Sequence, residues 1–329
     1  MRIQFSRGFV FLFAISLPFT GEAATPMPKA LAQQELAINV RGETKGKFYA
    51  YAGDNPKLTT KRVLGSGAKA DDVRQGYLNN CFLVGTLSSI AHAQPERIAK
   101  LFLTKKDGSL ALDEDGRASL GFYRRTNKGL VKEAVKVTAG LVYGKDGKPV
   151  FTKIANGKLW APLIEKGYAT LLSNHSRMKG FTRLDQGGAP SDVIEAVTGQ
   201  QSKFLVVNPT KAGADAAWKA LKTATANRAI VVAGSLESTD FRSRRNEAIA
   251  DGLLDKSARQ LTLKGQHIVG DHNEAVLGIS EKNGERTVTL RNPWGMFVPR
   301  GAGRSGGVYT LPLEKFVLFF DGLTYSGKS

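Results

Sequence analysis

The chain has 329 residues, 42% of them hydrophobic, which is the composition of an ordinary globular protein with room for two lobes or two modest domains. Its formal net charge is +18 at pH 7, so its surface should attract nucleic acid, anionic lipid or acidic polymers. A single cysteine excludes a scaffold that depends on internal disulfides.

The N-terminus has the pattern of a cleavable secretory signal. Arginines precede an apolar run from Phe9 to Phe19, and small residues follow it around Ala23. The run is shorter than the roughly 20 residues that span a bilayer, although an uncleaved anchor or a buried helix is the alternative. We therefore predict a signal peptide over 1–23, a leader or flexible extension over 24–62, and a secreted or periplasmic protein. No later segment is long and apolar enough to cross a membrane.

Clearer patterns begin at Val63, and we predict an N-terminal lobe over 63–200. Glycines and small residues over 65–76 indicate a loop, after which Asn79 or Asn80 caps a helix that starts at Cys81. Apolar residues recur at helical spacing in this helix. Further helices are predicted over 95–102, 158–172 and 188–199, the last with Ser191 as its cap, and strands over 118–125 and 130–138.

The rest of the chain, 201–329, is predicted to form a β-rich C-terminal lobe. A helix over 215–228 and a buried strand over 229–236 come first. Alternating runs over 273–280 and 286–292 flank Asn283-Gly284, a strong hairpin signal. A strand and a short helix follow over 307–320.

The densest basic cluster is Arg242 to Arg245. Aromatic residues, which would serve as stacking platforms for nucleic-acid bases, do not interleave with it. We therefore interpret it as a solvated basic face, with weak association with polyanions as a secondary expectation.

The lone thiol of Cys81 stands where a helix N-terminus would stabilise its thiolate. This favours a nucleophile, and a buried inert thiol is the alternative. The chain offers four histidines as a base: His92, His175, His267 and His272.

The predicted hairpin brings Asn292 back toward His272, and the asparagine oxygen would orient the imidazole without adding a charge. The alternative is that Asn292-Pro293 only ends a strand. Gln75 lies close enough along the chain to join the backbone N–H of Cys81 at an oxyanion.

Together these segments resemble the catalytic core of calpains, within the papain-like cysteine proteases. The nucleophile motif is matched by Gln75-Gly76 and Cys81-Phe82, the histidine segment by Gly270-Asp271-His272, and the sequence Arg-Asn-Pro-Trp-Gly by residues 291–295. The segments 159–171 and 187–199 are also similar, and the resemblance covers roughly 63–323. It implies an α+β, two-lobed papain-like fold with a substrate cleft between the lobes.

Carried over by position, the resemblance implies roles for individual side chains. Cys81 would be the nucleophile, His272 the general base and then acid, and Asn292 the residue that orients it. Gln75 would supply an oxyanion donor, and Trp294 would shield the contact between His272 and Asn292 from water. Asn79-Asn80 and Phe82 stand where the family has Gly-Asp and Trp, so the resemblance does not fix the substrate preference near the nucleophile.

Calpain cores also resemble one another in binding two calcium ions, one per lobe. The first site is matched by the carboxylates of Asp72 and Glu165 and by the backbone carbonyls of Gly65 and Gly67, which supply the oxygen ligands that calcium requires. The loop of the second site, 296–307, contains two arginines and no carboxylate. We therefore predict one calcium ion, in the N-terminal lobe, and none in the second site.

The sequence thus predicts a secreted, monomeric cysteine endopeptidase that acts on polypeptides, and the style of the signal favours a bacterial source. Two alternatives stay open. The same site would catalyse amide transfer or deamidation if another acceptor or substrate amide took part. A silent scaffold that binds acidic partners is the other.

Overall fold

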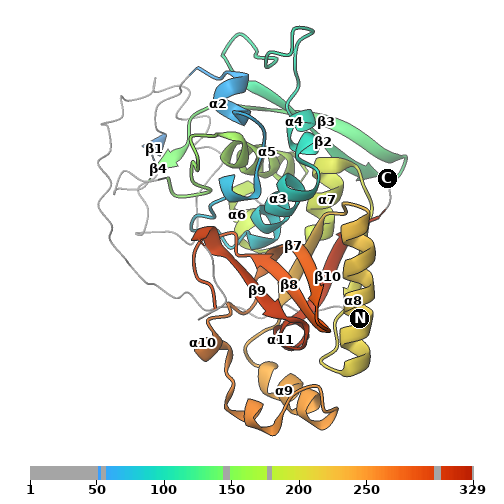
Figure 1. Cartoon of the computed structure of the whole chain (residues 1–329). Helices are drawn as coiled ribbons and strands as arrows, with labels where there is room; N and C mark the ends of the chain where they lie inside the picture. The colour runs from blue at the N-terminus through green and yellow to red at the C-terminus, as the bar shows by residue number, and fades with distance from the viewer. Residues whose placement is uncertain (1–50, 53–56, 144–148, 176–179, 300–304, 328–329) are drawn as a thin grey trace.

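The structure is a computed structural model that describes residues 51–52, 57–143, 149–175, 180–299 and 305–327. The predicted signal peptide lies outside these residues, as does most of the predicted leader. Two hydrophobic clusters make up the interior, one formed by residues between Leu58 and Val197 with Ile230, the other by residues between Val207 and Leu323. The predicted two-lobed α+β fold is confirmed (Figure 1).

The N-terminal lobe is built from helices, of which α4, α5 and α7 contact α3, and it is flanked by a two-stranded sheet. Its helices are α2 (Thr60–Leu64), α3 (Cys81–Ala93), α4 (Pro95–Leu101), α5 (Trp160–Asn174), α6 (Gly180–Asp185) and α7 (Pro190–Thr198). Its strands are β2 (Ala118–Thr126) and β3 (Gly129–Val137), with a short pair β1 (Tyr51–Ala52) and β4 (Val142–Tyr143). Apolar positions at helical spacing make α3 buried through most of its length.

The C-terminal lobe is a six-stranded antiparallel sheet in the order β5-β10-β6-β7-β8-β9. The strands are β5 (Ser202–Val206), β6 (Val231–Ser235), β7 (Asn273–Lys282), β8 (Glu285–Arg291), β9 (Val308–Pro312) and β10 (Phe320–Ser326). The helices are α8 (Lys211–Ala226), α9 (Phe241–Ala250), α10 (Leu263–Gln266) and α11 (Leu313–Phe319). In Figure 1 this sheet lies below the helices of the other lobe.

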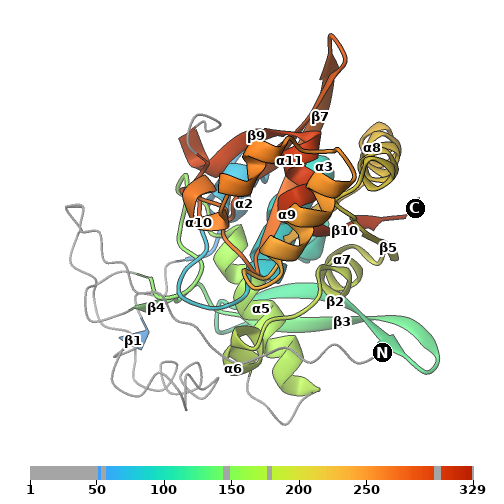
Figure 2. The same ribbon diagram turned by 90° about the horizontal axis from the view of Figure 1, so that it is seen from below.

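The predicted hairpin is formed by β7 and β8, which Figure 2 shows extending away from the body of the lobe. Lys282 pairs with Glu285 and encloses Asn283 (φ 51°) and Gly284 (φ 79°). Positive φ at both central residues is the requirement of a type I′ turn, which Asn-Gly meets at little cost. At the other end Ala275 pairs with Arg291, so the residues just beyond the pair, His272 and Asn292, lie near each other.

The caps of two helices and the start of a third differ from their predictions. Asn80 is the N-cap position of α3, but its side chain donates to Glu165 instead of capping the helix. The cap of α7 is Ala189 and not Ser191, because Pro190 already occupies the first turn, where it needs no donor. Helix α8 begins at Lys211, before the predicted start, because the Thr210 hydroxyl accepts a hydrogen bond from the Gly213 N–H.

The interpretation of Arg242 to Arg245 as a wholly solvated face is wrong for two of its members. Arg244 is half-buried and donates to the backbone carbonyls of Val207 (2.8 Å) and Phe320 (3.1 Å). Arg245 donates to the Leu261 carbonyl at 2.8 Å. These side chains satisfy carbonyls at the ends of core elements, so only part of the cluster faces solvent.

The two lobes meet where helix α3 lies against strand β7. Gly85 permits the approach, because a Cβ at this position would stand 2.6 Å from the Asn273 carbonyl oxygen. The fully buried Arg291 guanidinium crosses the same seam and donates to the Val73 carbonyl at 2.7 Å and to the Ser88 hydroxyl at 3.1 Å. The backbone contacts thus bring the start of α3 to the start of β7. None of the helices in the described ranges is long and apolar enough to span a bilayer.

Candidate active site

The single thiol stands at the first residue of α3, at the seam between the lobes. Cys81 is 6% exposed, and its sulfur lies 3.6 Å from the Asn273 side-chain nitrogen and 4.0 Å from the Asp271 carbonyl oxygen. Burial raises the pKa of the Cys81 thiol, and hydrogen bonds from Asn273 and from the backbone at the helix start act in the opposite direction. The positive end of the α3 dipole also favours the thiolate.

His272 is held through its backbone at the end of the loop that precedes β7. Its N–H donates to the Ser235 hydroxyl at 3.0 Å, and its carbonyl accepts from the Ser235 N–H at 2.8 Å. Ser235 ends β6, the neighbouring strand in the sheet. The imidazole is therefore fixed to the sheet of the C-terminal lobe, while the thiol belongs to the other lobe.

The amide of Asn292 determines which nitrogen of His272 carries the proton. His272 Nε2 lies 3.0 Å from Asn292 Oδ1, which also accepts from the Trp294 N–H at 2.9 Å, while Nδ2 donates to the Phe297 carbonyl at 3.2 Å. These partners fix the orientation of the amide, so its oxygen faces the ring. An amide oxygen only accepts, so the proton is on Nε2. Nδ1 is then the basic nitrogen of the neutral imidazole.

Trp294 covers this contact. Its ring centroid is 5.0 Å from that of His272 with an interplanar angle of 55°, and it makes an edge contact with Phe297 at 5.7 Å. His272 is 4% exposed and Asn292 is 1% exposed. Burial lowers the pKa of His272, and the Glu274 charge and the Asn292 hydrogen bond oppose that effect. The ring is consequently neutral near pH 7 in this arrangement.

Gln75 is tied to both lobes. Its backbone N–H donates to the Pro293 carbonyl at 2.9 Å, and its side-chain nitrogen donates to the Leu78 carbonyl at 2.9 Å. A side-chain amide carries two N–H groups, so one hydrogen remains for another acceptor. The side chain is 8% exposed.

The structure therefore brings together Cys81, His272, Asn292, Gln75 and Trp294. The hydrogen bonds of the described residues link the thiol to Asn273 and Asp271, not to the His272 ring. The other three histidines have other surroundings. His175 pairs with Glu133 at 2.7 Å, His267 ends α10 with φ 57°, and His92 is exposed in the last turn of α3.

Two residues near Cys81 and His272 were not identified from the sequence. Asn273 follows His272 and donates to the sulfur, although no sequence pattern distinguishes it from an ordinary strand residue. Glu274 is 1% exposed and accepts from the Tyr309 hydroxyl at 2.7 Å. A glutamate at an inward position of a strand is the signal that could have identified it.

The four groups predicted to bind calcium do not share one set of contacts. The Asp72 carboxylate accepts from Lys158 Nζ (3.0 Å), Trp160 Nε1 (2.9 Å) and the Lys69 N–H (2.8 Å) on one oxygen. The same ammonium donates to the Gly67 carbonyl at 2.8 Å. An ammonium group thus lies between two of the predicted calcium ligands.

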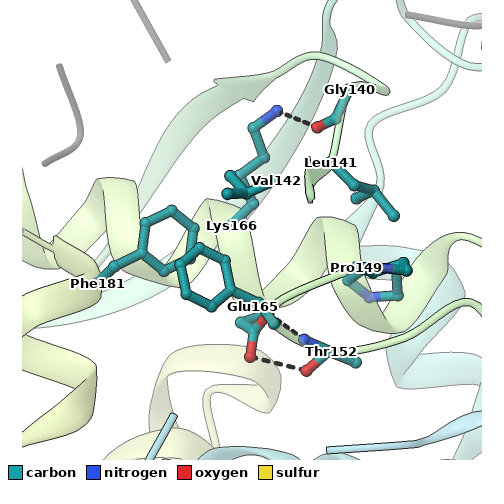
Figure 3. A pocket seen from close by; sticks show the side chains of 10 residues that line it. Gly140, Leu141, Val142, Pro149, Thr152, Glu165, Lys166 and Phe181 are labelled. Atoms are coloured by element: carbon teal, nitrogen blue, oxygen red, sulfur yellow. Dashed lines mark hydrogen bonds between the residues drawn. The ribbon is translucent and has the colours of Figure 1, made fainter. Parts of the chain in front are cut away.

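Glu165, the second predicted carboxylate, has separate partners. It accepts from the Thr152 N–H at 2.9 Å, from the Thr152 hydroxyl at 2.7 Å and from Asn80 at 2.6 Å. Figure 3 shows it directed toward Thr152, while the neighbouring Lys166 reaches the Gly140 carbonyl (2.7 Å). Burial raises the pKa of the Glu165 carboxyl, and its hydrogen bonds only partly oppose this. The loop of the second predicted site is described only in part, since 300–304 lie outside the described residues.

Comparison with known proteins matches most of the chain to one protein family. A model of the calpain family of cysteine proteases matches residues 52–303. The calpain-1 catalytic subunit of Bos taurus is 25% identical over 296 residues, which cover 88% of this chain and 36% of that protein. The human calpain-1 catalytic subunit is 25% identical over 285 residues, or 84% and 34% of the two chains. Calpain-5 of Caenorhabditis elegans is 26% identical over 241 residues, or 70% and 35%. The chain spans about a third of the length of these relatives.

Proposed function

The chain belongs to the calpain family of cysteine proteases, and we propose that it is an endopeptidase in which Cys81, His272 and Asn292 form the catalytic triad. The observation that carries the proposal is the hydrogen bond between His272 Nε2 and Asn292 Oδ1 at 3.0 Å. It leaves Nδ1 free to take a proton, in the same seam that holds the only thiol of the chain.

The first half of the reaction is acylation of the thiol. His272 Nδ1 takes the proton from Cys81, and the thiolate attacks the carbonyl carbon of the scissile peptide. A carbon–sulfur bond forms while the carbonyl becomes an oxyanion. The Cys81 N–H and the second N–H of the Gln75 side chain are the oxyanion donors in this proposal. Collapse of the oxyanion breaks the carbon–nitrogen bond, and the His272 imidazolium protonates the leaving amine.

The second half is hydrolysis of the thioester. Neutral His272 now removes a proton from water, which attacks the thioester carbon and releases the acid with a free thiol. Asn292 keeps the ring in the Nε2–H tautomer through both halves, and Trp294 reduces access of water to their hydrogen bond. Formation of the imidazolium is supported by the buried Glu274 nearby, whose charge raises the pKa of His272.

Thiol and imidazole are not hydrogen-bonded to each other in the described arrangement, so their pairing accompanies substrate binding in this proposal. Catalytic hydrogen bonds often tighten only in the complex with substrate. Asn273 would release the sulfur to the substrate carbonyl at that step.

Export and partners complete the proposal. We propose that residues 1–23 direct the mature protein out of the cytoplasm and that it acts as a monomer with polypeptide substrates. The net charge of +18 supports weak association with polyanions. The export step is tested by fusing residues 1–26 to a reporter enzyme and measuring the reporter outside the cytoplasm.

The test of the activity is cleavage of an unfolded protein by the full chain under reducing conditions. Wild type should cleave it, while Cys81→Ala should be inactive and Asn292→Ala strongly impaired. His92→Gln, which alters an exposed histidine of α3, is the matched control and should retain activity. Product masses separate hydrolysis from deamidation or amide transfer. If wild type and Cys81→Ala cleave equally, the thiol mechanism is wrong.

The reactivity of the Cys81 thiol distinguishes an active protease from a catalytically silent binding scaffold. In an active protease, the rate of Cys81 alkylation depends on pH with a midpoint below that of a free cysteine, because opening of the site exposes a thiolate that the N-terminus of α3 stabilises. A scaffold with an inert thiol would show slow alkylation and an unshifted midpoint.

A further inference from the structure

We propose that the ammonium group of Lys158 serves as a built-in cation in the N-terminal lobe, in place of the calcium ion that the family resemblance implies, so that the lobe holds its active arrangement without calcium. This inference concerns the regulation of the proposed protease and rests on that function for its importance. Its structural part stands on the contacts of Lys158 alone.

The position of the ammonium is the first support. Lys158 Nζ lies 2.8 Å from the Gly67 carbonyl oxygen and 3.0 Å from Asp72 Oδ2. The side chain runs along the glycine-containing loop, because its Cε would stand 3.1 Å from a Cβ placed on Gly65. It is 11% exposed and its partner Asp72 is 1% exposed. One positive charge therefore already bridges the loop carbonyl and the carboxylate.

Both oxygens of the Asp72 carboxylate already accept hydrogen bonds, so neither is available as a ligand for a calcium ion. One oxygen accepts from Lys158, from the indole of Trp160 and from the Lys69 N–H, and the other accepts from Asn156 Nδ2 at 3.0 Å. Calcium takes six to eight oxygen ligands at about 2.3–2.6 Å. Nitrogen donors surround this carboxylate instead, and a divalent ion would be repelled by the ammonium. The residues present do not fit the ion.

The second predicted carboxylate does not compensate. Glu165 faces Thr152 and Asn80, as Figure 3 shows for Thr152, and accepts hydrogen bonds from both. Among the residues that the structure describes, no group of three or more His, Cys, Asp or Glu side chains is arranged to hold a metal ion.

The location of this cluster connects it to the catalytic residues. The chain runs from Asp72 directly into three residues that contact the other lobe. The Val73 carbonyl accepts from Arg291, the Arg74 guanidinium donates to the Gly295 carbonyl at 2.6 Å, and the Gln75 N–H donates to the Pro293 carbonyl. A cation that fixes Asp72 therefore also fixes the segment that carries the oxyanion donor and holds the Asn292 loop.

An ammonium differs from calcium in how it is supplied. Lys158 lies two residues before Trp160, the first residue of α5, so its charge is attached to the core helix that also contributes an indole to Asp72. The ammonium of Lys158 is covalently tethered, so its presence at Asp72 does not depend on the calcium concentration of the solution. The segment from Asp72 to Gln75 is then in place at any calcium concentration, and Lys158 is a positioning residue for the proposed reaction.

The direct test uses the full chain carrying Cys81→Ala, which prevents self-cleavage. Calcium is titrated into it by calorimetry, and its melting temperature is measured with calcium and with chelator. We expect no saturable heat and no change in melting temperature. Saturable binding below 1 mM with a rise in melting temperature would overturn the proposal. Neither readout needs peptidase activity, so failure of the proposed function does not affect them.

Substitutions at Lys158 test the role of the charge. Lys158→Met leaves Asp72 buried without its cation and should lower the melting temperature by roughly 5–15 °C. The control Lys106→Met alters an exposed lysine and should leave the melting temperature within about 2 °C. Lys158→Glu replaces the ammonium with a carboxylate, and its lowered melting temperature should rise again with millimolar calcium. An unchanged melting temperature in Lys158→Met would refute the positioning role, and if that variant does not fold, the wild-type titration decides.

Discussion

The buried glutamate beside the triad gives a prediction about pH. Glu274 follows His272 by two residues in β7, and the Tyr309 hydroxyl donates to it at 2.7 Å. Burial raises the pKa of the Glu274 carboxyl to about 7 from 4.5; the Cys81 charge adds to the rise, while His272 and the Tyr309 hydrogen bond oppose it. We consider Glu274→Gln, which keeps the shape and the acceptor for Tyr309 but cannot ionise.

The direction of the change in stability with pH follows from whether the folded or the unfolded chain releases the Glu274 proton at the lower pH. Below pH 4.5 the carboxyl is protonated in both states, and it affects the pH dependence of stability little. Between pH 4.5 and 7 the unfolded chain ionises and the folded chain does not, so the stability of wild type falls. The loss is complete above pH 7 and amounts to roughly 3 kcal/mol, since each pKa unit is worth about 1.4 kcal/mol.

The assay is urea unfolding of wild type and Glu274→Gln at pH 5 and pH 8. The buried amide of the variant has its own cost for unpartnered N–H groups, so the absolute difference is not diagnostic. The free energy of unfolding of the variant relative to wild type should rise by about 2–3 kcal/mol from pH 5 to pH 8. The low pKa of His272 affects both proteins and largely cancels. Glu285→Gln, an exposed control on β8, should show no such change.

The same variant should alter catalysis. The Glu274 charge raises the pKa of His272, so its removal makes the imidazolium harder to form. Because the Glu274 carboxyl is ionised only above about pH 7, kcat/KM of Glu274→Gln relative to wild type should fall as the pH rises from 6 to 8. A relative stability that does not vary with pH would refute the assignment of a raised pKa to Glu274.

Three further substitutions act at the seam between the lobes. Gly295→Ala should reduce peptidase activity at least tenfold, because Gly295 has φ 71° and a Cβ would overlap the Arg74 guanidinium; unchanged kcat/KM would contradict this. Asn273→Leu removes the donor to the Cys81 sulfur, so the midpoint pH of thiol alkylation should rise, and a lower midpoint would be inconsistent with the contact. Arg291→Met leaves the Val73 carbonyl unpartnered and removes one donor from the Ser88 hydroxyl, which keeps its hydrogen bond to the Ala70 carbonyl. The free energy of unfolding, measured by urea denaturation, should fall by about 1–3 kcal/mol; no measurable loss would show that the seam does not depend on this side chain.

Sequence patterns predicted the elements whose signals are local. The helix from Cys81 and the hairpin about Asn283-Gly284 follow from apolar period and turn chemistry. The approach of Asn292 to His272 could be predicted because a single hairpin joins them. Helices α9 and α10 were not predicted, since α9 is polar on most of its surface and α10 has only four residues. Helix α9 is placed by its contacts with α11 and by the hydrogen bonds of Arg244, and α10 begins at the Thr262 cap.

The predicted calcium ligands show where local patterns are insufficient. A list of carboxylates in a resembling segment does not say which of them face each other. Trp160 and Glu165 are five residues apart on α5, which places them roughly 140° apart around the helix. The partners of each carboxylate could not be predicted from local patterns, since the contact between Asp72 and Trp160 joins residues 88 positions apart.

The same distinction between local and long-range contacts predicts two different ways in which a substitution can reduce activity. His272 and Asn292 are joined within one hairpin, so their hydrogen bond should survive small movements of the lobes. Cys81 and Gln75 come from the other lobe, and their distance from the imidazole depends on Gly85, Arg291 and the contact of Gln75 with Pro293. A displacement of about 1 Å at the seam is enough to cost roughly a hundredfold in rate. Substitutions at the seam should consequently lower kcat while the tautomer of His272, observed by the NMR signals of its ring nitrogens, stays the same. Asn292→Ala should change that tautomer while the lobes keep their positions.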